Sequence, residues 1–205
     1  MESLTIYPSS INQRFIEQAC DALRDGGIIV YPTDSLYAIG CDALNQKAIE
    51  RVCQIKNLNP QKNTLSIICA DISQAAEYAR IDNAAYQLLR QYTPGPFTFI
   101  LPAATTLPKA FKGRRTVGIR IPDNAIARAL CAELGNPLLT TSIPTTDEMT
   151  EEEITYPAEI AMRAEQWQPD LLIDGGEGSA TPSTIVDLTD SRSPKILRQG
   201  LGRLD

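Results

Sequence analysis

Histidine is absent from the 205-residue sequence, and its absence restricts the chemistry available to the protein. Without an imidazole no Ser-His-Asp triad or histidine general base can form, and most transition-metal sites lose their commonest ligand. Any reaction must therefore rely on hydroxyls, carboxylates, cationic side chains, backbone amides or the substrate itself. No protein-bound metal is expected.

Long hydrophobic runs are also lacking. No apolar stretch approaches the ~20 residues that a helix needs to cross a bilayer. The N-terminal MESLTIYPSS has neither the basic stretch nor the apolar core of a secretion signal. These absences predict a cytoplasmic protein that does not bind a membrane.

Cysteine is present but does not occur in pairs. The five cysteines, at positions 20, 41, 53, 69 and 131, are odd in number and far apart in the sequence, which argues against a disulfide framework and against a zinc knuckle. Each lies in an apolar stretch, so we interpret them as small buried residues in a reducing compartment. A nucleophilic cysteine is disfavoured because there is no histidine to activate it.

The common nucleotide-binding motifs GxxxxGK[ST] and GxGxxG are missing as well. The net charge of −6 argues against broad electrostatic adhesion to nucleic acid. The charge is nevertheless uneven, because the segment 109–120 contains five cations and no acid. These are Lys109, Lys112, Arg114, Arg115 and Arg120. The first four are typical of a solvated loop or of a contact with RNA phosphates, and Arg120 ends a predicted strand.

Hydrophobic periodicity predicts one α/β domain over residues 1–205, with a twisted mixed parallel and antiparallel sheet and packed helices. Helices are expected before Gly26-Gly27, from Asn45, near 71–79 and 82–92, from an Asp123 N-cap to Gly135, and near 157–167. Strands are expected at 4–7, 28–31, 65–69, 97–101, 117–120, 138–141, 171–174, 185–188 and 196–198. The acidic stretch Asp147–Glu153 is expected to be a solvated loop.

Polar residues follow several of the predicted strands, and in open α/β sheets ligands bind beyond strand ends. Thr33 and Ser35 follow the strand 28–31, and Thr140-Thr141-Ser142 follows an apolar run. Asp174-Gly175-Gly176 precedes a second polar run, Thr181–Thr184, and its glycines would let backbone amides approach a ligand. Taken singly, each of these segments is a weak signal, and ordinary turn chemistry is the favoured interpretation.

Seven blocks, taken in order, resemble the motifs of the YrdC/YciO family over nearly the whole chain. They are Tyr31–Asp42, Lys56, Pro94–Leu101, Val117–Pro122, Thr140–Ser142, Pro182–Asp187 and Leu197–Gly200. Lys56-Asn57-Leu58, Ser66–Asp71 and Thr141-Ser142-Ile143-Pro144 look most like the YciO branch. The resemblance implies one twisted sheet around a large concave, positively charged cavity.

The resemblance also implies a function. The catalytic branch of the family combines threonine, bicarbonate and ATP with Mg²⁺ into threonylcarbamoyl-adenylate, the donor for a tRNA adenosine modification. Members have also been linked to double-stranded RNA and tRNA. Carried over by position, Thr33 and Tyr37 would line the threonine side, and Lys56 and Arg120 would hold phosphates or the carboxylate. The residues implied to contact the nucleotide are Thr141, Ser142, Ser183, Thr184 and Arg198.

Two positions depart from the family's catalytic pattern. Leu58 stands where Lys-x-Arg has its arginine, and Ile143-Pro144 stands where Ser-Ala-Asn has its alanine and asparagine. Losing a hydrogen bond to a charged group costs roughly tenfold to a hundredfold in binding or rate. Three hypotheses therefore stay open: a threonylcarbamoyl-adenylate synthase, a nucleotide- or RNA-binding protein without that activity, and a domain that binds an unrelated anion.

Overall fold

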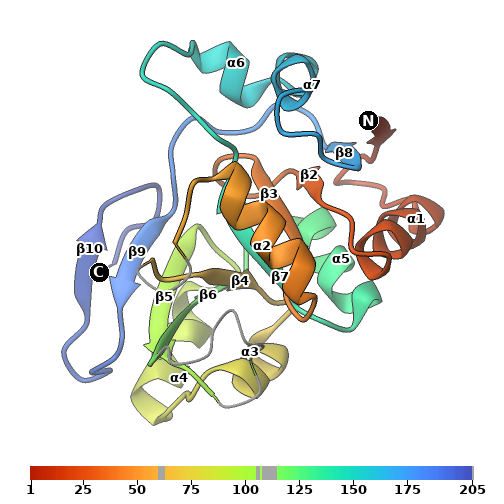
Figure 1. Cartoon of the computed structure of the whole chain (residues 1–205). Coiled ribbons are helices and arrows are strands. Elements are labelled where there is room, and N and C mark those ends of the chain that lie inside the picture. The colour runs from red at the N-terminus through yellow and green to blue at the C-terminus, as the bar shows by residue number, and fades with distance from the viewer. Residues whose placement is uncertain (60–62, 105–106, 108–114, 205) are drawn as a thin grey trace.

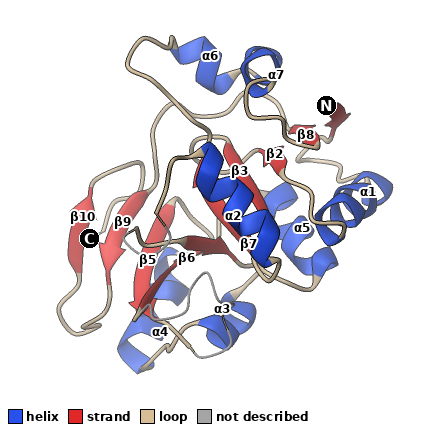
Figure 2. Ribbon diagram, viewed as in Figure 1, coloured by secondary structure: helices blue, strands red, loops and turns tan. Residues whose placement is uncertain are grey.

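The computed structural model describes residues 1–59, 63–104, 107 and 115–204. The described residues form a ten-stranded sheet in the order β1-β8-β2-β3-β7-β4-β6-β5-β9-β10, flanked by helices (Figures 1 and 2). The two edge strands, β1 and β10, are the first and the last in sequence. The N-terminal and C-terminal segments therefore lie at opposite edges of the sheet.

The bounds of the elements agree with the predicted periodicity at most positions. The strands are β1 (Glu2–Thr5), β2 (Ile29–Tyr31), β3 (Ala38–Asp42), β4 (Ser66–Ile68), β5 (Phe97–Pro102), β6 (Thr116–Arg120), β7 (Leu138–Ser142), β8 (Leu171–Asp174), β9 (Thr184–Asp187) and β10 (Lys195–Arg198). The helices are α1 (Gln13–Arg24), α2 (Gln46–Ile55), α3 (Ile72–Tyr78), α4 (Asn83–Tyr92), α5 (Ala125–Leu134), α6 (Glu151–Thr155) and α7 (Pro157–Ala164).

Strand directions are mixed, as the sequence predicts. β8 pairs in parallel with β1 and β2, β4 with β6, and β5 with β9. β3 pairs antiparallel with β2 and β7, and the β9–β10 pair is also antiparallel. Because β7 lies between β3 and β4, and β9 lies beside β5, polar residues from distant parts of the sequence lie at neighbouring positions of one sheet.

Two hydrophobic clusters cover the two faces of the sheet. Side chains of α1 and α5 pack with Ile29 and Tyr31 of β2, whereas Val30 packs in the cluster that contains α2, α3 and α4. A strand alternates its side chains between faces, so a strand buried on both faces must be apolar throughout. All five cysteines are free thiols and buried, as predicted. None of the described helices is long and apolar enough to cross a membrane.

Two local predictions are wrong, and one strand was not predicted. The N-cap of α5 is Asn124, whose side chain accepts a hydrogen bond from the Ala127 amide, whereas the Asp123 amide donates to Asp34. β3 was not predicted as a strand. The acidic stretch Asp147–Glu153 is not entirely a loop, because α6 begins at Glu151 after a capping box formed by Thr150 and Glu153.

Burial of the thiols makes stability depend on alkaline pH. Burial raises the pKa of Cys131 from the ordinary 9.0 to about 12. The unfolded chain loses this proton above pH 9 while the folded protein keeps it, so stability falls between pH 9 and about 12. We expect the stability advantage of the parent over Cys131→Ala to shrink by up to about 1.4 kcal/mol per pH unit in this window. Urea unfolding at pH 8, 9 and 10 measures it, and an advantage independent of pH would contradict the prediction.

Candidate functional site

A cavity of about 290 Å³ is lined by residues from β4, β5, β6, β7, β9 and β10, together with the end of α2 and the segment before β3. Two of its lining residues are arginines, Arg120 from β6 and Arg198 from β10. Hydroxyl side chains supply most of the other polar groups. Among the described residues, no aspartate or glutamate lines the cavity. The cavity is therefore cationic in a chain whose net charge is −6.

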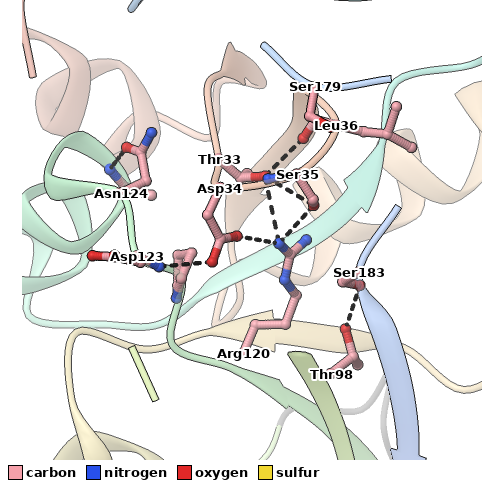
Figure 3. A network of polar contacts seen from close by, with 12 residues as sticks. Thr33, Asp34, Ser35, Leu36, Thr98, Arg120, Asp123, Asn124, Ser179 and Ser183 are labelled. Atoms are coloured by element: carbon pink, nitrogen blue, oxygen red, sulfur yellow. Dashed lines mark hydrogen bonds and ion pairs between the residues drawn. The ribbon is translucent and has the colours of Figure 1, made fainter. Parts of the chain in front are cut away.

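Arg120 ends β6 and is almost completely buried. Its Nη2 lies 3.0 Å from Asp34 Oδ1, 3.0 Å from Ser35 Oγ and 3.4 Å from Thr33 Oγ1 (Figure 3). The Arg120 and Asp34 side chains are 9% and 8% exposed, respectively. The Nε of Arg120 is buried and has no hydrogen-bond partner in the part of the chain that the structure describes. Arg120 lines the cavity, and its contacts with Asp34 and Ser35 fix the position of its guanidinium in the cavity wall.

Arg198 reaches the cavity from the edge strand β10. Its Nε and Nη2 donate to the backbone carbonyl of Ser183 at 3.2 and 2.8 Å. Ser183 Oγ is in turn 3.0 Å from Thr98 Oγ1 on β5, which is visible in Figure 3. Burial, followed by the positive charge of Arg120, lowers the pKa of Arg198. Two guanidinium groups thus repel each other across a cavity that contains hydroxyls, an arrangement that an anion would relieve.

Thr141 and Ser142 lie at the end of β7 and line the same cavity. They are half-buried, and β7 pairs with β3 so that Ser142 lies opposite Ala38. The structure thus brings together Arg120, Thr141, Ser142, Ser183 and Arg198, five of the predicted site residues.

Four other predicted site residues do not line the cavity. The Thr33 hydroxyl contacts Arg120, which lines the cavity, and donates to the Leu36 carbonyl at 2.8 Å. Thr184 is fully buried and donates to the Gly202 carbonyl at 2.7 Å. Lys56 caps α2, and its Nζ donates to the Ile143 carbonyl at 3.2 Å, while burial lowers its pKa. The fourth, Tyr37, is directed toward residues 174–178, which we call the glycine segment.

Tyr37 holds the segment that leads to Ser183. Its buried hydroxyl donates to the Gly176 carbonyl at 2.7 Å and accepts from the Gly175 amide at 3.1 Å. The Gly178 amide donates to the Thr155 carbonyl, also within the protein. These amides of the glycine segment are thus engaged internally, contrary to the expectation that they approach a ligand.

Replacing Tyr37 with phenylalanine is expected to lower the free energy of unfolding by about 1–3 kcal/mol, because the Gly175 and Gly176 backbone groups lose their partner. Urea unfolding checks this value. The control is Tyr86→Phe, since Tyr86 is 43% exposed on α4. A loss no larger than that of the control would contradict the role of the hydroxyl.

Three of the five residues of the predicted basic cluster lie outside the part of the chain that the structure describes. Lys109, Lys112 and Arg114 lie outside the described residues, and Arg115 is exposed. Two residues that contribute to the site were not predicted from the sequence. Thr98 lies inside β5, where no strand-end signal marks it, and Asp34 contacts the cavity only through Arg120.

Comparison with known proteins assigns the family. The family model Sua5_yciO_yrdC, described as "Telomere recombination", matches residues 21–200. The chain belongs to the Sua5/YciO/YrdC family. It is 42% identical to the uncharacterized protein YciO of Escherichia coli over 200 residues, covering 96% of this chain and 94% of YciO. The crystal structure of E. coli YciO matches with a TM-score of 0.88 at 40% identity, covering 99% of this chain and 98% of that one.

More distant members of the Sua5/YciO/YrdC family carry an assigned activity. The threonylcarbamoyl-AMP synthase of Chromobacterium violaceum is 35% identical over 188 residues, covering 90% of this chain and 94% of that protein. The structure of P. abyssi Sua5 complexed with L-threonine matches with a TM-score of 0.84 at 28% identity, covering 98% of this chain and 58% of Sua5. The predicted family, its YciO branch and the α/β fold with a mixed sheet and packed helices are therefore confirmed.

Proposed function

We propose that this protein binds ATP in the cavity between Arg120 and Arg198 and uses it to form threonylcarbamoyl-AMP. The observation that carries the proposal is the pair of arginines in a cavity that no described carboxylate lines. Guanidinium groups bind phosphates through paired donors, and the triphosphate of ATP would offset their mutual repulsion. The relationship to threonylcarbamoyl-AMP synthases supplies the reaction.

The reaction suits a protein without histidine. The amine of threonine attacks bicarbonate and water leaves, giving a carbamate. A carbamate oxygen then attacks the α-phosphorus of ATP, and pyrophosphate leaves. Arg120, Arg198 and Ser183 would position the phosphates and neutralise the charge that develops on them. Mg²⁺ would enter bound to the nucleotide and assist in this neutralisation.

A second candidate is an ATP-binding protein that does not form the adenylate and acts on tRNA or double-stranded RNA. Two observations favour it. Leu58, at the position of the family's arginine, presents an apolar side chain to the cavity. Lys56 is bonded to the Ile143 carbonyl and does not line the cavity.

Incubation with ATP, threonine, bicarbonate and Mg²⁺ distinguishes the two candidates, with pyrophosphate and the adenylate as the products measured. Threonine-dependent formation of both is expected for the first. ATP binding without product would reject it in favour of the second. A protein that neither binds ATP nor forms product would contradict both.

RNA binding is tested through its salt dependence. Phosphate contacts by Arg115 and the three cations that precede it in the sequence predict that the affinity for tRNA falls between 50 and 200 mM salt, with a log–log slope of about −0.9 for each phosphate neutralised. An affinity that barely changes would contradict these contacts.

A further inference from the structure

We propose that Asp34 is a positioning residue of the ATP site, which holds the Arg120 guanidinium at the cavity wall so that it can donate to the bound anion. This inference rests on the proposed function, because the anion is taken to be a phosphate of ATP. Asp34 does not line the cavity, and its effect on the ligand passes through Arg120.

The carboxylate of Asp34 bridges two parts of the fold. Oδ1 accepts from Arg120 Nη2 at 3.0 Å, and Oδ2 accepts from the Asp123 amide at 2.8 Å (Figure 3). The second bond fixes the carboxylate to the segment that enters α5. The bond to the Asp123 amide holds the Asp34 carboxylate in place independently of Arg120. The carboxylate in turn fixes the orientation of the Arg120 guanidinium.

Only one side of the guanidinium is taken up by the protein. Asp34, Ser35 and Thr33 all contact Nη2, and the buried Nε has no partner among the described residues. Had Asp34 been present merely to neutralise Arg120, a bidentate pair through both nitrogens would be the stronger arrangement. The contacts made through Nη2 orient Arg120, so that the part of the guanidinium that lines the cavity is left for the ligand.

Asparagine is the informative replacement because it preserves the shape of the side chain. Asp34 accepts from two N–H groups at once, whereas an amide has one oxygen and one NH₂. Asp34→Asn can therefore satisfy either the Asp123 amide or Arg120. A buried guanidinium without its counter-ion is destabilised, so Arg120 is expected to turn toward solvent in this variant.

A purely electrostatic role of Asp34 predicts that Asp34→Asn changes the affinity for ATP in the opposite direction. If Asp34 only reduced the positive potential of the cavity, removing its charge would tighten the binding of anions. Positioning predicts that Asp34→Asn weakens ATP binding roughly tenfold, the loss of one oriented hydrogen bond to a charged group. The control is Asp123→Asn, which removes the same charge nearby from a side chain that is 73% exposed and bonded to Arg128.

The experiment combines calorimetric titration with ATP and a double-mutant cycle. Asp34→Asn is expected to weaken binding about tenfold in the parent and to have no further effect in Arg120→Gln, because Asp34 acts only through Arg120. Asp123→Asn is expected to bind ATP like the parent. Unchanged or tighter binding in Asp34→Asn, or an equal loss in both backgrounds, would overturn the proposal.

Side-chain ¹⁵N NMR of the ligand-free protein tests the positioning without ATP. The Nη signals of Arg120, assigned by their loss in Arg120→Gln, are expected to be distinct in the parent because Asp34 restrains rotation about the Nε–Cζ bond. They should average in Asp34→Asn. Distinct signals in both would overturn the positioning, whereas a parent that shows them but does not bind ATP would overturn the proposed function and leave the role of Asp34 intact.

Discussion

Arg120→Gln is expected to weaken ATP binding roughly tenfold to a hundredfold. The substitution removes one of the two arginine charges that line the cavity, and Arg198 and Ser183 are left to bind the phosphates. It also leaves the 8%-exposed Asp34 carboxylate without its counter-ion. Breaking a buried ion pair costs about 3–5 kcal/mol, so the free energy of unfolding should fall by a similar amount.

Calorimetric titration with ATP and urea unfolding measure the two effects separately. The matched control is Arg128→Gln on α5, which loses a guanidinium bonded to the Pro122 carbonyl and Asp123 but does not line the cavity. The control should keep the affinity of the parent. An Arg120→Gln variant that binds ATP as tightly as the parent would remove Arg120 from the site.

Gly200→Ala is the second substitution with a large expected effect. A Cβ at position 200 would overlap the Pro182 carbonyl oxygen and lie 2.6 Å from the Ser183 carbonyl carbon, both rigid backbone atoms. The Gly200 amide also donates to Thr184 Oγ1 at 2.9 Å, so the segment cannot move away without losing this bond. We expect a loss of about 3 kcal/mol in the free energy of unfolding.

The same change should weaken ATP binding about tenfold, because Arg198 precedes Gly200 by two residues and would move with it. The control is Gly135→Ala, where φ is +76° and no atom lies within 4 Å of the added Cβ. It should cost only the backbone strain, about 1–2 kcal/mol, and leave ATP binding unchanged. Equal losses of unfolding free energy and of ATP affinity in the two variants would contradict the overlap between the Cβ at position 200 and the Pro182 carbonyl oxygen.

Periodicity predicted most elements of the fold because their apolar residues repeat at the spacing of a helix or a strand. β3 escaped prediction because all of its residues, including Gly40 and Asp42, are buried, so no alternation of apolar and polar residues marks it. α6 escaped because its signal is a capping box in a highly acidic stretch rather than an apolar face. The order of the strands depends on contacts between distant segments, which local pattern does not encode.

The site was predictable where a polar residue ends a strand, as Arg120, Ser142 and Arg198 do. Sequence does not reveal which way a side chain points. The hydroxyls of Tyr37 and Thr184 and the amine of Lys56 are directed to backbone carbonyls, where they stabilise the segments around the cavity. The role of Asp34 required the distance between a loop residue and the end of β6, which lie 86 residues apart in the sequence.

A crystal structure of the protein with ATP and Mg²⁺ bound tests the central claim most directly. The account predicts phosphate oxygens within hydrogen-bond distance of the Arg120 guanidinium, the Arg198 guanidinium and Ser183 Oγ, with Asp34 still bonded to Arg120. A triphosphate bound elsewhere, with both arginines unchanged and uncontacted, would contradict it.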